Sequence, residues 1–283
     1  MNPGNNLPER NIAIIGYGRL GGALAQALSK AGMKITGIVE PVSQRHSERL
    51  PFFKTVNDLD RNIDLVFICV PDDCIKNVIA EIAEYKGFKQ NTIIAHTAGS
   101  HSSDILAPLK EFDAKLLAWH PLQTFTGFET PEVFRGITIG MDGDREAVEI
   151  GMKLAEILGS TGIEIPPEAR TAWHLAAVLV SGMTVGLLSE AEDLMKSTGI
   201  DSEIARNALA PLCLTTVQNF RDRGTQDAST GPLVRGDVET IKRHIDFLKD
   251  RTKTKSLYSL INRILLQKIG KVTNSEEMKR LFE

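Results

Sequence analysis

Short apolar runs alternate with amphipathic stretches along the first half of the chain. Residues 12–15 form a continuous apolar run, which is typical of a strand buried on both faces of a sheet. Apolar residues between Leu20 and Ala31 are spaced three and four apart, which predicts a helix with one buried face. The same reasoning predicts strands at 35–39, 64–70, 92–96, 116–119 and 136–140, and covering helices at 73–85 and 103–112. This alternation predicts an α/β fold with a doubly wound parallel sheet.

The pattern changes near Pro166 and Pro167. Beyond them the chain has no convincing strand alternation, and helices are expected at roughly 170–197, 201–221, 237–249 and 254–271. We therefore predict two domains, an α/β domain at 1–165 and an all-helical domain at 166–283.

One stretch of the helical part, residues 171–188, contains no Asp, Glu, Lys or Arg and has about the length that spans a bilayer. It includes His174 and Gly182, however, and acidic residues such as Glu190 follow directly. A helix that is apolar on nearly all sides also suits the centre of a soluble domain or dimer. We expect the soluble alternative, without a membrane partner.

Composition narrows the class of protein. The 283 residues are 42% hydrophobic and 24% charged, which is typical of a soluble globular protein. A net charge of −3 gives no electrostatic reason to expect nucleic acid as a partner. Three cysteines are too few for a secreted disulfide framework, and the polar residues 1–10 do not form a signal peptide. A cytoplasmic protein is expected.

The segment Gly16–Gly21 reads G-x-G-x-x-G between the first strand and the first helix. In that context the pattern predicts a dinucleotide site. Gly16 permits the tight turn, Gly18 lets the backbone approach a pyrophosphate, and Gly21 lets the helix lie close to the strand. The helix N-terminus offers free N–H groups to the same anion. The cofactor-binding prediction includes the whole loop, with Tyr17, Arg19 and Leu20.

Glu40 lies 19 residues beyond Gly21, at the end of the second predicted strand. An acid there accepts hydrogen bonds from the adenosine ribose and repels a 2′-phosphate, which favours NAD. Ser43, Arg45 and His46 follow and suit a 2′-phosphate, so NADP stays open.

Two later strand ends are predicted to flank the nicotinamide, because ligands of parallel sheets lie beyond the carboxyl ends of the strands. The first carries Val70 and Pro71, and the second carries Thr97. Asp72 or Asp73 is interpreted as a helix N-cap rather than a catalytic acid.

His120 follows another predicted strand and precedes a proline. Histidine titrates near neutrality, so we predict His120 as the general acid/base that relays a proton in a hydride-transfer reaction. The alternative is a hydrogen-bonded histidine that orders the loop. Gln123 is a candidate substrate contact in the same loop.

Arg170, His174 and Ser181 are spaced to lie near one face of the apolar helix. Such a polar stripe is either a buried, satisfied network or the wall of an interdomain site. As a site, it would supply His174 to catalysis and Arg170 and Ser181 to substrate binding.

Arg235 could bind a substrate carboxylate, or it could be a surface charge or pair with Asp237, a predicted N-cap. The sequence holds no metal-ligand motif, nucleophile elbow or phosphate-binding P-loop of the NTPases.

The motifs together resemble the family of Rossmann-like proteins that carry the domain of unknown function 2520. The resemblance rests on Gly16–Gly21, Val70–Asp72, the His-Pro-Leu-Gln-Thr-Phe string at 120–125, residues 174–177 and residues 231–237. It implies a Rossmann-type N-terminal domain and a helical C-terminal domain like that of 6-phosphogluconate dehydrogenase. It also implies similarity to deazaflavin-dependent NADP oxidoreductases and pyrroline-5-carboxylate reductases, and a homodimer built through the C-terminal helices. That family often has Ser-Arg where this chain has Glu40–Pro41, so the resemblance favours NADP whereas Glu40 favours NAD.

These observations predict an NAD(P)-dependent dehydrogenase or reductase. The substrate would be a small carboxylated metabolite with a C=O/C–OH or C=N carbon, bound between the two domains. The alternative is an NAD(P)-binding sensor or scaffold protein without turnover.

Overall fold

The computed structural model describes residues 7–40, 50–127 and 129–283. The chain forms two compact units, Met1–Ser181 and Gly182–Glu283, each of which is described by itself. The division therefore falls 16 residues beyond the expected boundary at Ile165. The physical reason is that the first turn of helix α4 (Arg170–Val180) is tied to the sheet through Arg170 and Asp142.

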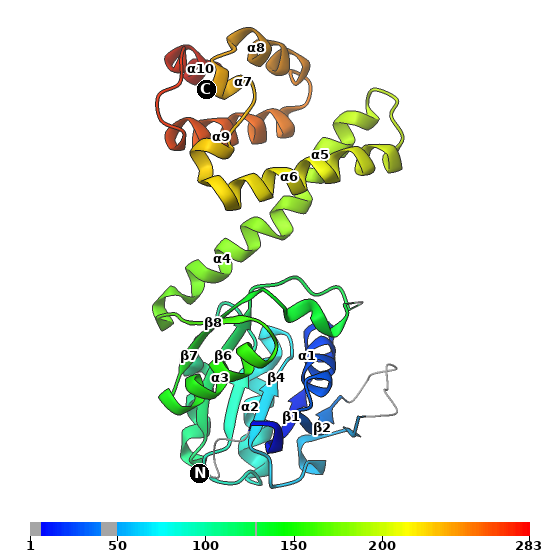
Figure 1. The fold of residues 1–283 in the computed structure, drawn as a ribbon, viewed down its shortest axis with the longest axis vertical. Helices are drawn as coiled ribbons and strands as arrows, with labels where there is room; N and C mark the ends of the chain where they lie inside the picture. The colour runs from blue at the N-terminus through cyan, green and yellow to red at the C-terminus, as the bar shows by residue number, and fades with distance from the viewer. Residues whose placement is uncertain (1–6, 41–49, 128) are drawn as a thin grey trace. The chain divides into compact units, whose positions relative to one another are not determined.

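The first unit is built on an eight-stranded sheet with the order β3-β2-β1-β4-β5-β6-β7-β8 (Figure 1). All neighbouring strands are parallel except β6 and β7, which are antiparallel. The strands are β1 (Asn11–Ile15), β2 (Lys34–Val39), β3 (Phe52–Phe53), β4 (Leu65–Ile68), β5 (Ile93–His96), β6 (Lys115–Pro121), β7 (Thr138–Gly143) and β8 (Thr161–Glu164). Six were predicted. The two-residue β3 and the half-exposed β8 carry too weak an apolar signal.

Helices cover both faces of this sheet, as the doubly wound prediction requires. Helix α1 (Arg19–Lys30) and helix α3 (Arg145–Ile157) bury their apolar residues against one face, together with Ile12 and Ile14. Helix α2 (Ile75–Tyr85) and the 3₁₀ segment η5 (Ser103–Phe112) cover the other face. Helix α3 was not predicted, and η5 is a 3₁₀ segment that contains Pro108 rather than the expected α-helix. Shorter 3₁₀ turns are η2 (Leu7–Glu9), η3 (Val56–Asp58), η4 (Asp72–Cys74), η6 (Pro131–Phe134) and η7 (Pro167–Ala169).

The strand order of the sheet indicates where a ligand would bind. From β1 the chain proceeds outward to β2 and β3 and then returns to β4 on the other side of β1. Ligands of such sheets bind at this switch point, beyond the carboxyl ends of the strands. The loops after β1, β4, β5 and β6 all leave the sheet at that edge, since these strands are parallel.

The second unit is all helical, as expected. It contains α5 (Gly182–Lys196), α6 (Ser202–Ala228), α7 (Pro232–Arg235), α8 (Val238–Phe247), α9 (Thr252–Lys268) and α10 (Ser275–Leu281). A small core that includes Leu233, Ile241 and Met278 joins its last four helices. The helix expected at 170–197 is interrupted at Ser181, and α6 runs past its expected end with a kink at Gly224.

Candidate active site

The glycine loop has the strained geometry that its motif predicts. Gly16 adopts a positive φ of 94°, and a β-carbon there would lie 2.7 Å from the backbone oxygen of Cys69. A β-carbon at Gly21 would lie 2.0 Å from the backbone oxygen of Gly16. No other residue fits at either position without displacing backbone, so both glycines are needed to join β1 to α1 this closely.

Gly18 is different, because a β-carbon there would meet no atom within 4 Å. Gly18 is the exposed N-cap of α1, and no side chain caps this helix end. The Tyr17 ring lies edge-on against Phe52 with ring centroids 4.9 Å apart, and Arg19 is exposed. The positive end of the helix dipole is thus open for an anion, and a side chain at Gly18 would fill that space. The loop fits the pyrophosphate of a dinucleotide.

Glu40 ends β2 beside this loop. Its Oε2 accepts a hydrogen bond from the backbone N–H of Tyr17 at 2.8 Å. The carboxylate therefore orients the loop, and its contact with a ribose stays a prediction. Ser43, Arg45 and His46, the alternative contacts for a 2′-phosphate, lie outside the described residues.

The ends of β4 and β5 lie next to β1 at the same edge. Val70 is half-buried and Pro71 is exposed. Thr97 is buried, and both its hydroxyl and its backbone N–H donate to the backbone oxygen of Ile68, at 3.3 and 3.2 Å. The N-cap interpretation of Asp72 and Asp73 is wrong: α2 has Cys74 at its N-cap with no side-chain bond.

Asp72 instead faces the loop after β5. Its carboxylate accepts a hydrogen bond from the Ser100 hydroxyl at 3.1 Å and lies 4.0 Å from Nε2 of His101. The loops after β4 and β5 are thereby joined at the edge of the candidate site.

His120 lies near the end of β6 and receives a hydrogen bond that the sequence did not reveal. The indole Nε1–H of Trp173 donates to Nδ1 of His120 at 3.0 Å. Burial and, to a smaller extent, the positive charge of Arg170 lower the pKa of His120 to about 4. The imidazole is therefore neutral at pH 7.

His174 lies opposite His120, with ring centroids 6.0 Å apart and an interplanar angle of 78°. Both rings approach Gly99, where a β-carbon would lie 2.5 Å from Cδ2 of His174 and 2.7 Å from Nε2 of His120. The absence of a side chain at Gly99 leaves room for both imidazoles. The structure thus brings together the two residues predicted as catalytic.

Arg170 is not available as a substrate contact. Its side chain is 1% exposed, its Nε donates to Asp142 at 2.5 Å, and its Nη2 donates to the backbone oxygen of Ala118 at 3.2 Å. Asp142 also accepts the backbone N–H of Ser103 at 2.7 Å. Of the two alternatives for the polar stripe, the buried network describes Arg170, because the chain supplies its own carboxylate, but the network is not fully satisfied: Nη1 is buried without a hydrogen-bond partner among the described residues.

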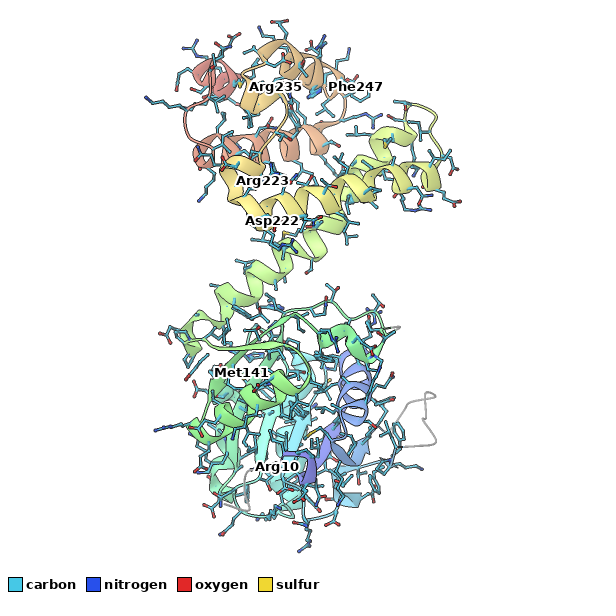
Figure 2. The ribbon with its side chains drawn as sticks, viewed as in Figure 1. Arg10, Met141, Asp222, Arg223, Arg235 and Phe247 are labelled. Atoms are coloured by element: carbon cyan, nitrogen blue, oxygen red, sulfur yellow. The ribbon has the colours of Figure 1, made fainter. Side chains whose placement is uncertain are left out.

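The hydrogen bonds of Gln123 and Ser181 do not involve the histidine pair. The Gln123 side chain is exposed and bonds within its own loop, to the N–H of Thr124 and the oxygen of Val133. The Ser181 hydroxyl donates to the backbone oxygen of Ala177 at 2.7 Å, where α4 ends. Arg235, labelled in Figure 2, is an exposed residue of α7 in the second unit. Asp237 does cap α8, by accepting the N–H of Thr240 at 3.1 Å.

Sequence reasoning missed Trp173, Gly99 and Asp142. Trp173 directly precedes His174, but its bond to His120 spans 53 positions of the chain. Gly99 follows a predicted strand, but no local pattern indicates that two imidazoles meet at it. Asp142 lies inside a strand that pairs antiparallel with β6, and no local pattern indicates that pairing.

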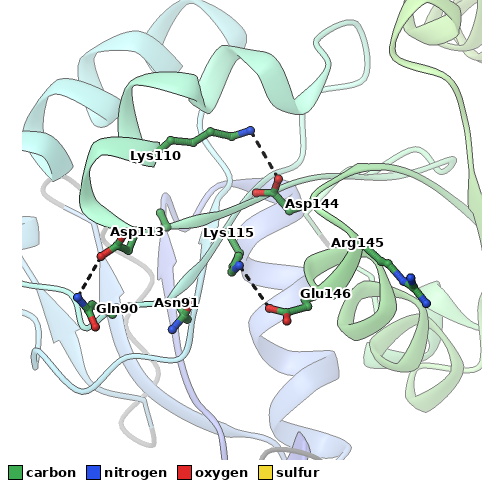
Figure 3. A pocket seen from close by; sticks show the side chains of 9 residues that line it. Gln90, Asn91, Lys110, Asp113, Lys115, Asp144, Arg145 and Glu146 are labelled. Atoms are coloured by element: carbon green, nitrogen blue, oxygen red, sulfur yellow. Dashed lines mark hydrogen bonds and ion pairs between the residues drawn. The ribbon is translucent and has the colours of Figure 1, made fainter.

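A second depression on the first unit lies at the other end of the sheet, at the N-terminal ends of β5 and β6 (Figure 3). Its charged side chains neutralise one another: Lys110 lies 3.6 Å from Asp144, and Lys115 lies 3.5 Å from Glu146. Every cation there has an acidic neighbour. The depression also lies at the N-terminal ends of the strands, whereas ligands of parallel sheets bind beyond the carboxyl ends, so it is not the candidate site.

One helical stretch, Pro167–Lys196, is long and apolar enough to cross a membrane by length and composition, and none of its most apolar window is buried. Its first turn, however, holds the buried Arg170.

Comparison with known proteins agrees with the two-part organisation. Residues 2–121 match the family model of the Rossmann-like domain, and residues 137–264 match that of the domain of unknown function 2520. The chain thus carries both domains named by the sequence resemblance.

Solved structures share the fold over nearly the whole chain. One from Bacteroides fragilis, described as an NADP oxidoreductase, is 22% identical, with a TM-score of 0.76 over 92% of this chain and 99% of that one. The pyrroline carboxylate reductase of Plasmodium falciparum, solved with NADP bound, is 13% identical, with a TM-score of 0.64 over 98% and 100% of the two chains.

Two curated proteins show sequence similarity. The NADP-dependent ketol-acid reductoisomerase of Methanosphaera stadtmanae is 27% identical over 71% of this chain, and the D-lactate dehydrogenase of Streptococcus pyogenes is 27% identical over 47% of it. The matches span 64% and 41% of the lengths of these two relatives.

Proposed function

We propose that this chain is an NAD(P)-dependent oxidoreductase that transfers hydride to or from a small carboxylated metabolite. The observation that carries the proposal is one sheet edge with an open glycine loop after β1 and a pair of facing histidines beyond β5 and β6. The similar proteins whose names include NADP or a dehydrogenase activity support it.

The coenzyme would be held by the loop Gly16–Gly21, through backbone N–H groups and the end of α1. Glu40 would accept the ribose hydroxyls, which favours NAD over NADP. The backbone at Val70, Pro71 and Thr97 would flank the nicotinamide. When bound, the coenzyme supplies or accepts the hydride, and the chain's own residues orient the substrate.

His120 and His174 are the residues proposed to act on the substrate. His120 is neutral at pH 7 and shielded from solvent, so it is suited to hold a substrate atom by a hydrogen bond. His174 is half-exposed and faces the same space, and we assign it the exchange of the proton with the product. With Arg170 used internally, Arg235 stays the proposed contact for a substrate carboxylate.

The test of the coenzyme site is Gly18→Ala, measured by thermal shift with NAD, NADP and their reduced forms. At about 100 times its Kd a coenzyme stabilises the fold by about 2.7 kcal/mol, which raises Tm by several degrees. Gly18→Ala adds a β-carbon that meets no protein atom, so the unliganded Tm should stay unchanged while coenzyme affinity falls at least about tenfold.

The matched control is Gly22→Ala, one turn further along the same helix. Its β-carbon would meet only Tyr17 atoms at 3.8–3.9 Å, which is an ordinary contact, so binding should persist. No shift of the unaltered protein with any of the four coenzymes would refute the proposal. A shift without substrate-dependent change in absorbance of the reduced coenzyme across a panel of keto and hydroxy acids would favour the sensor or scaffold alternative.

A further inference from the structure

We propose that Trp173 is a positioning residue that fixes His120 as the tautomer protonated at Nε2, so that the substrate atom facing His120 is a carbonyl or hydroxyl oxygen and not a protonated imine nitrogen. This inference rests on the proposed function and chooses between the C=O and C=N substrate classes that the sequence left open.

The tautomer follows from the chemistry of the two rings. An indole N–H can only donate a hydrogen bond, so the Nδ1 that receives it from Trp173 at 3.0 Å presents a lone pair. A neutral imidazole with a free Nδ1 carries its hydrogen on Nε2. Nε2 is the His120 atom nearest to Gly99, in the space that His174 also faces. His120 therefore presents a donor to that space.

The indole is held in place on two sides. A β-carbon at Gly140 on β7 would lie 2.9 Å from Cε2 of Trp173, so the ring packs closely against the strand at a position that only glycine leaves open. Arg170, three residues earlier on α4, is fixed by Asp142 on the same strand. Trp173 therefore keeps its N–H aimed at His120 without help from a ligand.

The charges around His120 favour the neutral form. Burial, Arg170, His174 and His96 lower its pKa to about 4, and among the contributing groups only Asp72 opposes them. Protonation at Nδ1 would also break the hydrogen bond from Trp173. A proton relay through both ring nitrogens is thus disfavoured, and His120 instead stabilises negative charge that develops on the facing atom.

The substrate class follows from the donor. A carbonyl oxygen accepts the Nε2–H bond, and this bond strengthens as the oxygen gains negative charge during reduction. An imine accepts hydride readily only when its nitrogen is protonated, and that nitrogen then has no lone pair. Two donors would face each other in a buried space, which penalises the imine strongly.

The test uses the ¹⁵N-histidine NMR spectrum of the full-length protein, in which six histidines give a resolvable set. At pH 7 the His120 signals, assigned through His120→Gln, should show hydrogen on Nε2 and a bare Nδ1. In Trp173→Phe the tautomers should mix, because Nδ1 loses the donor that holds its lone pair, and the His120 pKa should rise, because a hydrogen bond to the neutral form is lost. The control is Trp119→Phe, which removes the indole N–H that bonds Gly151 and should leave His120 unchanged.

A wild-type His120 protonated at Nδ1, or a Trp173→Phe spectrum identical to wild type, would overturn the positioning role. The substrate part is tested separately with reduced coenzyme and matched pairs of 2-keto acids and cyclic imines. Turnover of the keto acids only is expected, and turnover of the imines only would overturn it. Failure of the proposed function can be told apart from failure of the positioning role. The first appears as absent coenzyme binding, whereas the tautomer experiment needs no coenzyme.

Discussion

Glu40 shows how a single carboxylate can serve both the fold and the choice of coenzyme. Its Oε2 accepts the Tyr17 N–H, so part of its role is to hold the glycine loop in place. The same negative charge at the end of β2 is poorly suited to a nearby 2′-phosphate. A substitution that removes both properties would not separate them.

Glu40→Gln separates the two roles, since the amide oxygen can still accept the Tyr17 N–H while the charge is lost. A repulsion of about 1 kcal/mol disappears, so the preference for NAD over NADP should fall about fivefold. The measurement is the ratio of the two Kd values by calorimetry. Glu156→Gln, an exposed position on α3, is the charge control. An unchanged ratio in Glu40→Gln would mean that other residues select the coenzyme.

At the scale of elements, helix α4 carries Trp173 and His174 to the sheet, and one buried ion pair fixes it there. Arg170 and Asp142 are almost fully buried, and each makes a further hydrogen bond to backbone. Removing one partner of such a pair leaves the other charge buried without compensation.

Asp142→Asn should therefore lower the free energy of unfolding by about 3 kcal/mol, measured by urea denaturation at pH 7. Glu149→Gln is the matched comparison, because it removes one partner of the exposed pair Arg145–Glu149 and should cost less than about 1 kcal/mol. If the two variants lost equal stability, the anchoring role of Asp142 would be refuted.

At the scale of the whole molecule, helix α6 exposes more apolar surface than an isolated soluble chain tolerates. Leu212, Leu214, Val217 and Phe220 are each between 57% and 71% exposed. We propose that a second copy of the chain covers this surface in a cytoplasmic homodimer. A membrane suits the neighbouring apolar stretch poorly, because its first turn is tied to the sheet by the buried ion pair of Arg170 and Asp142.

Leu214→Glu should convert the dimer to a monomer, because it introduces a charge into the apolar surface. Light scattering after gel filtration should then give 31.1 kDa instead of about twice that mass. Gln267→Glu adds the same charge at an exposed position of α9 and should remain dimeric. A wild-type protein that is monomeric without detergent at micromolar concentration would contradict the dimer, and recovery only from the membrane fraction would favour a bilayer.

Local patterns were sufficient for the elements whose signal lies within a few residues. The buried runs of β1, β4 and β5, the stripe of α1 and the G-x-G-x-x-G turn all follow from spacing that neighbouring residues decide. The same patterns failed for β3, β8 and α3, and they extended one helix through Ser181. The apolar signal was weak in β3 and β8 and continuous through Ser181, whereas α3 has a clear apolar stripe that sequence reasoning missed.

The sequence by itself determined the α/β class, the glycine loop and the position of His120 at a strand end, because strand burial and glycine geometry are local constraints. Only the tertiary structure decided that Arg170 is bound internally, that Gly99 admits two imidazoles, and that Trp173 holds one nitrogen of His120. Those contacts join residues 21 to 75 positions apart. They depend on the antiparallel pairing of β6 with β7 and on where α4 begins, which no short stretch of sequence specifies.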